Sequence, residues 1–392
     1  MWGQQQQAAT RTKQRVTPSR RIKDDTAPSH EDSKAHVTSF KAVDLREQLQ
    51  MVAYPVAVEV VLSVADRYFL AWKAAMLASS EVTGDDLLTL IDQFVFCKNG
   101  LVLTSPFDEL QLLDVIRKHL SQQHDVQVKL CTFDTLYGFI NRDDDKMRGL
   151  HQLTSFMVTA ANGSGMDCVA NWMKLHPTEA LEIADKLYHD FCVLLPHADE
   201  PFMMIGKASP HLAYRLLLAY TIQYPMNDAQ SFPPITLVRA VLRWLTDCPK
   251  LFTDGEGHTH KLRLLRSRPL NPEATPLAGL IQWSTVGPIE HASYEDTYSD
   301  FHYKLLVAIG NHQSNKSYSI SGDQLIVLAY LLLKHAGNRG VDKAVDRLAQ
   351  ILQVCVSSKM ISTRSAHLNT LLSVLPSNRL LNMVVLHNNI NN

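Results

Sequence analysis

One short segment of the 392-residue chain carries side chains that could together hold a metal ion. In the run DGEGHTH, Glu256, His258 and His260 stand at alternate positions, and two imidazoles with one carboxylate form a partial zinc ligand set. The same residue types also occur in solvated polar loops, and the other histidines of the chain are scattered. We interpret the segment as a polar loop and expect no bound metal; the alternative is a metal-assisted hydrolase.

Two further segments have the residue types of known sites but not their spacing. The acidic run Asp143-Asp144-Asp145 could bind a divalent cation, yet it lacks the glycine and glutamate positions of a calcium loop. The run Asn162-Gly163-Ser164-Gly165 resembles a phosphate-binding loop, yet no lysine follows it and no strand precedes it. We interpret the first as part of a polar connector over residues 141–146, and the second as a turn that separates two helices.

The sequence contains no pattern that pairs a nucleophile with its base or binds a cofactor. GxSxG, the P-loop, GxGxxG after a strand and HExxH are all missing. The six cysteines are far apart and form no CxxC pair, which favours small buried thiols in a reducing compartment; they are Cys97, Cys131, Cys168, Cys192, Cys248 and Cys355. We therefore expect no catalytic residue and no cofactor.

A locally basic segment lies in the loop-like stretch 254–275 of a chain whose net charge is only −1. Its cationic side chains are Lys261, Arg263, Arg266 and Arg268. Cations at this density could contact nucleic-acid phosphates or dock on an acidic patch of another protein. The third interpretation is a solvated loop whose leucines turn inward.

A second basic cluster lies near the start of the chain, in a segment over residues 1–42 that is rich in polar residues and poor in apolar ones. It includes Arg20, Arg21 and Lys23. Such a composition predicts a disordered tail, because too little apolar surface is present to offset the entropy lost on ordering. The cluster suits a nuclear-import signal or a weak nucleic-acid contact, and a solvated tail without a role is the alternative.

The overall composition is ordinary for a soluble globular protein, with 46% hydrophobic and 20% charged residues and a pI near 7.0. No apolar run reaches the roughly 18 residues that a membrane-spanning helix needs. The first residues also lack the apolar core of a signal peptide. We therefore expect no membrane partner, and the total charge gives no argument for nucleic acid.

The elements around these segments are predicted to be helices. The most informative stretch runs from Ser209 to Phe252 and indicates two helices separated by a break over Tyr224–Asp228. Ser209 suits an N-cap position, with Pro210 in the first helical turn. The second helix is apolar on so much of its circumference that it must be covered on more than one side, which predicts a middle position in a helical stack.

Most of the remaining chain has the same helical periodicity, with few strand signals and no fixed repeat length. Residues 126–140 mix strand-like and helix-like patterns, and we predict a helix there. A short helix over 275–283 should be followed by a polar link over 284–297. The predicted fold is all-α, an irregular stacked helical array of the α-solenoid or HEAT-like kind. Its predicted parts are the tail 1–42, an array over 43–253, a basic loop over 254–275 and a helical segment over 276–392 packed on that array.

Several helical segments, in order along the chain, resemble subunit 15 of the Integrator complex. They are DLREQLQ and VADRYF in the first predicted helices, FDELQLLDVI at 107–116, VANWM at 169–173, ASPHLAYRL at 208–216, PPITLVRAVLRWLTDCPKL, TPLAGLIQW at 275–283, VDRLAQILQV at 345–354 and LPSNRLLNMVV at 375–385. The resemblance covers residues 43–386 and excludes the basic tail, and the 254–270 loop matches poorly.

This resemblance implies a non-enzymatic scaffold subunit of a nuclear assembly that works with RNA polymerase II. Integrator cleaves nascent RNA, forms the 3′ ends of small nuclear RNAs and attenuates transcription, with its endonuclease in other subunits. The implied partners are the module of subunits 10, 13 and 14 and, indirectly, the polymerase and nascent RNA, with no small-molecule substrate. The alternative function is a nucleic-acid-binding helical repeat protein that uses residues 261–268.

The alternative can be tested in the basic loop. If this loop contacts RNA, replacing Arg263, Arg266 and Arg268 with alanine should weaken binding and flatten its salt dependence, because fewer counterions are released. Affinity would be measured by fluorescence anisotropy over a range of salt concentrations, with Arg20 and Arg21 replaced in a second variant. An RNA affinity that the triple substitution leaves unchanged would show that the loop is not the site.

Overall fold

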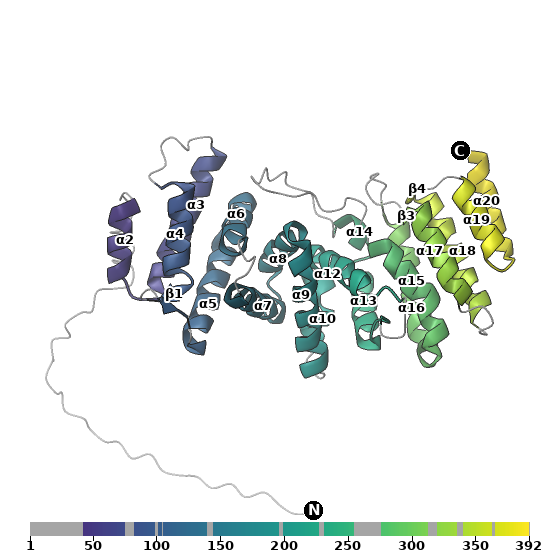
Figure 1. Cartoon of the computed structure of the whole chain (residues 1–392), viewed down its shortest axis with the longest axis horizontal. Helices are drawn as coiled ribbons and strands as arrows, with labels where there is room; N and C mark the ends of the chain where they lie inside the picture. The colour runs from purple at the N-terminus through teal and green to yellow at the C-terminus, as the bar shows by residue number, and fades with distance from the viewer. Residues whose placement is uncertain are drawn as a thin grey trace, which may run out of the picture.

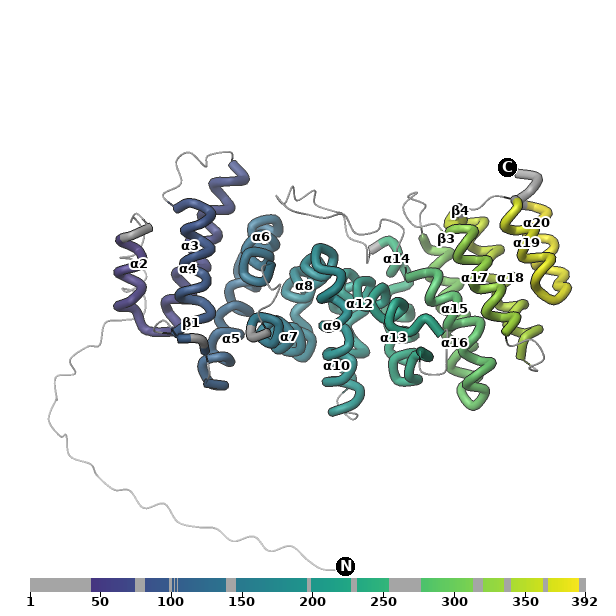
Figure 2. Tube along the Cα trace, viewed as in Figure 1, coloured from purple at the N-terminus to yellow at the C-terminus, as the bar shows by residue number. Residues whose placement is uncertain are grey.

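The computed structural model confirms the predicted all-α, stacked helical array. It describes residues 42–74, 82–98, 101–103, 105–138, 144–195, 199–226, 231–254, 276–312, 320–334, 340–362 and 365–391. Within them the helices follow one another along one long axis, from α2 at one end to α20 at the other (Figure 1). The tube view shows the same order, so neighbours in sequence are neighbours in space (Figure 2). The predicted disordered tail lies outside the described residues except for its last position.

The helices of the first part are short to medium in length. They are α2 (Ala42–Met51), α3 (Val56–Lys73), α4 (Gly84–Phe94), α5 (Pro106–Gln122), α6 (Val126–Tyr137), α7 (Asp144–Thr159), α8 (Gly163–Leu175), α9 (Pro177–Tyr188), the π-helix η2 (His189–Leu194), α10 (Glu200–Met203), α11 (Ile205–Ala208), α12 (Pro210–Gln223), α13 (Ile235–Asp247) and α14 (Leu251–Asp254).

The remaining helices complete the array. They are α15 (Pro276–Glu290), the 3₁₀ turn η3 (Ala292–Tyr294), α16 (Glu295–Gly310), α17 (Gly322–Lys334), α18 (Val341–Ser357), α19 (Ser365–Val374) and α20 (Arg379–Asn391). The described residues also form two pairs of two-residue strands: β1 (Cys97–Lys98) runs antiparallel to β2 (Leu101–Val102), and β3 (Ile320–Ser321) runs parallel to β4 (Ile361–Ser362).

Local capping explains where several helices begin. The Ser209 hydroxyl accepts a hydrogen bond from the Leu212 N–H at 3.1 Å, which confirms the predicted N-cap of α12. The Asp125 carboxylate accepts hydrogen bonds from the Gln127 and Val128 N–H groups of α6 in the same way. The ambiguous segment 126–140 is therefore helical from Val126 to Tyr137, as predicted.

The pair α12 and α13 occupies the interior of the stack. Leu237, Val241 and Trp244 of α13 are fully buried. Helix α12 contacts α8 and α9 as well as α15, while α13 contacts α11 and α16. The indole N–H of Trp244 donates to the Phe202 carbonyl at 2.9 Å, so this large side chain is buried without a lost hydrogen bond. The predicted middle position of α13 is confirmed.

The helices on the two sides of residues 255–275 pack directly on each other. Helices α15 and α16, which follow that segment, contact α12 and α13, which precede it. The indole N–H of Trp283 donates to the Tyr224 carbonyl at 2.9 Å and ties α15 to the end of α12. The division of the chain into an array over 43–253 and a segment over 276–392 stays a prediction, but described residues make the contact between these two parts.

The predicted polar link over residues 284–297 is wrong. Helix α15 runs on to Glu290, and Ser284 and Thr285 are buried inside it. The Thr285 hydroxyl donates to the Ile281 carbonyl at 2.9 Å, and the Ser284 hydroxyl lies 2.9 Å from a histidine nitrogen of α16. These polar residues indicated a loop because their internal partners cannot be recognised from their types alone.

A proline lies inside the extended part of α15, and a distant arginine compensates for it. Pro288 has no N–H to give to the carbonyl of Ser284, four residues earlier. Arg347 of α18 supplies the missing donor, with its Nη1 at 3.2 Å from that carbonyl oxygen. Its Nη2 is 2.7 Å from a carboxylate oxygen of Glu295 and 2.9 Å from the Ser299 hydroxyl. One guanidinium thus joins α15, α16 and α18.

Removing this guanidinium should destabilise the array. Arg347→Met takes one hydrogen-bond donor from the Ser284 carbonyl and one from the Glu295 carboxylate. We expect the free energy of unfolding to fall by about 3 kcal/mol, measured as a lower urea midpoint. Lys343→Met is the matched control, because Lys343 is 2.5 Å from the same carboxylate but 60% exposed. Lys343→Met should lower the free energy of unfolding by less than about 1 kcal/mol.

A second substitution tests the link to the proline. Pro288→Ala restores a backbone N–H that can bond to the Ser284 carbonyl, so Arg347→Met should cost less in that background than in the natural chain. The two single variants and the double variant form a cycle that isolates this coupling. Equal costs in both backgrounds would show that Arg347 does not compensate for Pro288.

Candidate interaction surfaces

The basic residues singled out in the sequence lie outside the described residues. This holds for Lys261, Arg263, Arg266 and Arg268, and for Arg20, Arg21 and Lys23. The candidate metal ligands Glu256, His258 and His260 lie outside them as well. The roles of all these residues stay predictions. Across the part of the chain that the structure does describe, no group of three or more His, Cys, Asp or Glu side chains is arranged to hold a metal ion.

The described parts of the two other candidate segments lie where helices begin, and Asp143 of the acidic run is outside the described residues. The predicted connector over 141–146 is wrong from Asp144 onward, because α7 begins there. A break between two helices is confirmed here, but it lies over residues 160–162, between the end of α7 and the start of α8. The predicted turn over 163–165 is wrong, because Asn162 caps α8 through the Gly165 N–H at 3.1 Å and Gly163 already begins that helix.

A serine, a histidine and an aspartate meet between α7 and η2 without the geometry of a catalytic triad. His151 Nε2 is 2.8 Å from the Asp190 carboxylate and 3.4 Å from the Ser155 hydroxyl. The Ser155 hydroxyl itself donates to Asp190 at 3.0 Å. A triad needs the serine and the carboxylate on opposite ring nitrogens, so that the histidine can take the serine proton. Here one nitrogen faces both groups, and the three side chains join α7 to η2.

The buried cysteines are equally unsuited to nucleophilic chemistry. Five of the six cysteines are buried, which confirms the predicted buried thiols, and only Cys97 is half-buried. Burial raises the pKa of Cys131 to about 11 and that of Cys168, Cys192 and Cys355 to about 12. At neutral pH these four groups are therefore thiols, whereas the thiolate is the reactive form.

A buried polar chain joins three helices of the C-terminal part. The His302 ring of α16 lies 2.9 Å from the Ser284 hydroxyl through Nδ1 and 2.9 Å from the Gln350 side-chain oxygen through Nε2. A neutral ring with its proton on Nε2 satisfies both contacts. Burial lowers the pKa of His302, which favours this neutral ring. The hydrogen bonds thus help to fix how α15, α16 and α18 are placed against one another.

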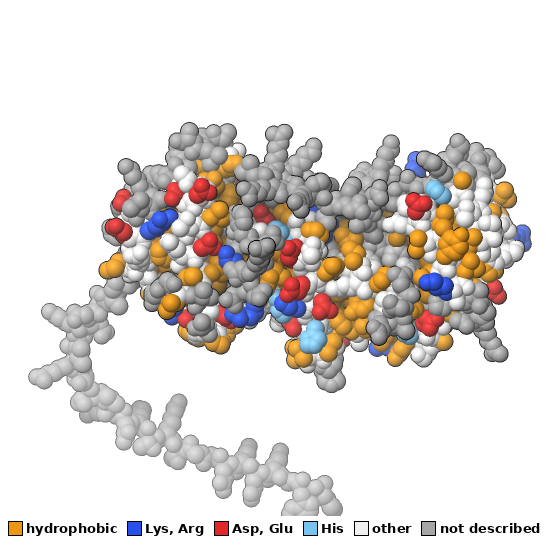
Figure 3. All heavy atoms as spheres, viewed as in Figure 1, with side chains coloured by type: hydrophobic (Ala, Val, Ile, Leu, Met, Phe, Trp, Pro, Cys, Tyr) orange, Lys and Arg blue, Asp and Glu red, His pale blue; other side chains and the backbone are white. Residues whose placement is uncertain are grey.

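Exposed apolar side chains are grouped on helix α17. Val327 and Tyr330 stand three residues apart and are 60% and 54% exposed. Ile326 and Leu333 flank them and are half-buried. Figure 3 shows hydrophobic side chains gathered over this part of the array. We call these four residues the α17 face; contiguous apolar side chains left in water are typical of protein contact surfaces.

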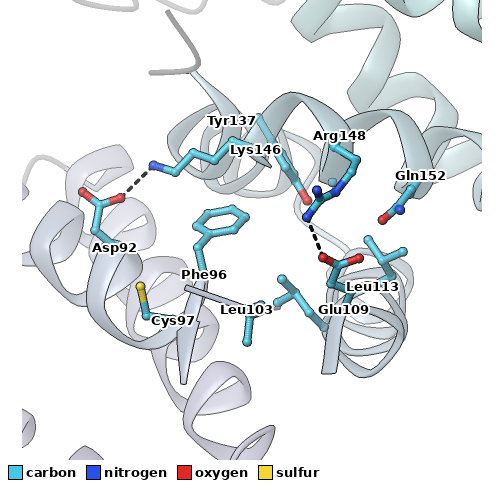
Figure 4. Close-up of a pocket in the computed structure, with 12 residues that line it drawn as sticks. Asp92, Phe96, Cys97, Leu103, Glu109, Leu113, Tyr137, Lys146, Arg148 and Gln152 are labelled. Atoms are coloured by element: carbon cyan, nitrogen blue, oxygen red, sulfur yellow. Dashed lines mark hydrogen bonds and ion pairs between the residues drawn. The ribbon is translucent and has the colours of Figure 1, made fainter. Parts of the chain in front are cut away.

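A second apolar area lies towards the other end of the array, beside a cavity. Phe107 and Leu110 of α5 are 67% and 64% exposed. One helical turn further on, Leu113 lines a cavity of about 290 Å³ (Figure 4). Its walls come from the end of α4, the β1–β2 hairpin, α5, α6 and α7; the lining residues are Asp92, Phe96, Cys97, Leu103, Glu109, Leu112, Leu113, Tyr137, Lys146, Arg148, Gly149 and Gln152.

The fold and these surfaces define an elongated helical-array protein, a class that typically holds other proteins on the surface of the stack. None of the described helices combines the length and apolar composition that crossing a membrane requires. A family model described as Integrator complex subunit 15 matches residues 43–377. The chain therefore belongs to the Integrator complex subunit 15 family, which confirms the resemblance of its helical segments.

Curated relatives agree with this family. The chain is 26% identical over 344 residues to Integrator complex subunit 15 of Danio rerio, covering 76% of this chain and 70% of the relative. It is 25% identical over 346 residues to the Homo sapiens protein, covering 76% of each. The Drosophila melanogaster protein is 24% identical over 331 residues, with 76% of this chain and 87% of the relative covered.

The buried histidine predicts how stability depends on pH. Because the pKa of His302 is lowered in the folded chain, the unfolded chain binds a proton first as the pH falls below about 6.5, and stability decreases. His302→Gln keeps hydrogen-bonding groups but cannot be protonated, so its urea midpoint should fall less between about pH 7 and pH 5 than that of the natural chain. Equal decreases in the two proteins would contradict this role.

Proposed function

We propose that this chain is a non-catalytic bridging subunit of the Integrator complex. The observation that carries the proposal is the family match, which spans residues 43–377. The architecture supports it, because an elongated stack can present separate helix faces to separate partners. The exposed apolar residues of α5 and the α17 face stand towards opposite ends of this stack (Figure 1).

The finer role follows the family resemblance. The chain would act in the nucleus, contact the module of subunits 10, 13 and 14, and support 3′-end formation of small nuclear RNAs and attenuation or termination of transcription by RNA polymerase II. Contacts with the polymerase and with nascent RNA would be indirect. The chemistry would come from other subunits. The raised pKa values of the buried thiols and the single shared nitrogen of His151 support a non-catalytic role.

The α17 face is our candidate for one of the subunit contacts. Its four side chains are largely apolar, and a contact with another protein would remove them from water. Lys334 and Asp323 are exposed at the two ends of the same helix and would lie at the rim of such a contact. An apolar centre with a charged rim is the usual composition of protein interfaces.

Purification from nuclear extract tests the assignment. The tagged chain should recover Integrator subunits, identified by mass spectrometry, and the subunits of the 10, 13 and 14 module should be among them. Recovery of no Integrator subunit would defeat the proposal. If other Integrator subunits were recovered without that module, the proposed membership of the complex would stand, and the proposed contact with subunits 10, 13 and 14 would be rejected.

Two charged substitutions test the α17 face. Val327→Asp with Tyr330→Asp should reduce recovery of at least one subunit about tenfold or more, because carboxylates placed in an apolar interface must be desolvated. Gln353→Asp with Ser357→Asp on the exposed side of α18 is the matched control and should leave recovery unchanged. Unfolding curves of both variants would verify that the array is intact. Full recovery with the α17 variant would exclude that face as a contact.

A further inference from the structure

The cavity between α4, α5, α6 and α7 has the size and lining of a site for one side chain. Its volume of about 290 Å³ lies at the lower limit of the roughly 300–1,000 Å³ that is usual for small-molecule sites. Phe96, Leu103 and Leu113 give it apolar walls. Transfer of an apolar or aromatic group from water into this cavity would therefore be favourable.

The charged groups at the cavity are paired with one another. Lys146 Nζ lies 2.8 Å from the Asp92 carboxylate, and Arg148 Nη2 lies 2.6 Å from the Glu109 carboxylate. Figure 4 shows these two ion pairs on either side of the space, each joining α7 to another helix. Because each positive charge has a negative partner, the lining favours a neutral occupant over a phosphate or a metal ion.

One buried polar group in the cavity wall lacks a hydrogen-bond partner. Tyr137 is fully buried, and its hydroxyl makes no hydrogen bond within the described residues. Figure 4 shows its ring extending from α6 towards the space between Phe96 and Arg148. A buried hydroxyl without a partner costs about 1–3 kcal/mol, so an occupant that bonds to it would be stabilised. Apolar walls with one unsatisfied hydroxyl favour a group that is apolar along its length and polar at its tip.

Two further features connect the cavity to a larger contact. A Cβ atom added to Gly149 of α7 would meet no side chain and no backbone of another element within 4 Å, so the space reaches the helix backbone. Outside it, Leu110 lies one helical turn before Leu113 and is exposed together with Phe107. A chain segment whose side chain entered the cavity would cover these two residues with its flanks. This arrangement suits a protein partner better than a free small molecule.

We propose that the cavity receives a tyrosine or tryptophan side chain of a partner protein, whose polar tip bonds to the Tyr137 hydroxyl while its flanking residues cover Phe107 and Leu110. Both side chains combine a large apolar body with one hydrogen-bonding group, and both are over-represented among the residues that dominate binding energy at interfaces. The site is independent of which complex the chain joins.

The proposal can be tested on the purified full chain with side-chain analogues. The probes are p-cresol, which represents tyrosine, and toluene, which represents phenylalanine, titrated by NMR. Binding of p-cresol should depend on the Tyr137 hydroxyl. Tyr137→Phe should lower the affinity for p-cresol by about three- to tenfold, which corresponds to the loss of one hydrogen bond, and should leave the affinity for toluene unchanged. A failure of p-cresol to bind, or equal effects of Tyr137→Phe on both probes, would overturn the proposal.

A second variant places binding in the cavity. Gly149→Leu fills the space from α7 and should abolish binding of both probes, whereas Thr159→Leu adds the same side chain at an exposed position of that helix and should abolish neither. If the Gly149→Leu variant fails to fold, Gly149→Ala is used instead, because its added Cβ meets no neighbour. Gly149→Ala should lower the affinity for both probes. Probe binding that survives every Gly149 substitution would reject the cavity. None of these outcomes bears on membership of the Integrator complex.

Discussion

The contact of Arg347 with the Ser284 carbonyl is the constraint that fixes α18 against α15 and α16. Pro288 would leave that carbonyl without its helical donor in the interior, where an unmet polar group is costly. The guanidinium meets this need and also pairs with Glu295, so α18 cannot shift along α15 or α16 without breaking several hydrogen bonds. The hydrogen bonds of His302 to Ser284 and Gln350 impose a second constraint on the same three helices. Shape complementarity of leucines alone would tolerate more sliding.

These polar ties differ in kind from the packing of the central helices. Around α12 and α13 the buried side chains are mostly apolar, and the indole groups of Trp244 and Trp283 each bond to a backbone carbonyl of a neighbouring element. Such bonds set the depth to which a large side chain enters, while the apolar area supplies most of the free energy. The array is thus a series of local helix contacts, many of them fixed by one or two directional bonds.

The sequence predicted the helices well because their periodicity and caps are local. Ser209 and Pro210 marked the start of α12 correctly, and the helix over 126–137 was recovered despite its mixed pattern. The length of α15 was underestimated because its buried polar residues have partners far away in the chain. The ion pairs and cavity around Tyr137 were missed for the same reason: they unite residues from five elements. The one available signal was Gly149 within a helical run, which indicates open space or close packing only after the neighbours are known.

The direct packing of α15 and α16 on α12 and α13 has a consequence for the peptide that connects them. Covalent continuity through residues 255–275 is not what holds the two parts together, because the described helices meet face to face. A protease cut within that stretch would therefore leave two fragments that co-migrate as one particle in the absence of denaturant. Insertions or sequence drift there would likewise leave the helical stack intact.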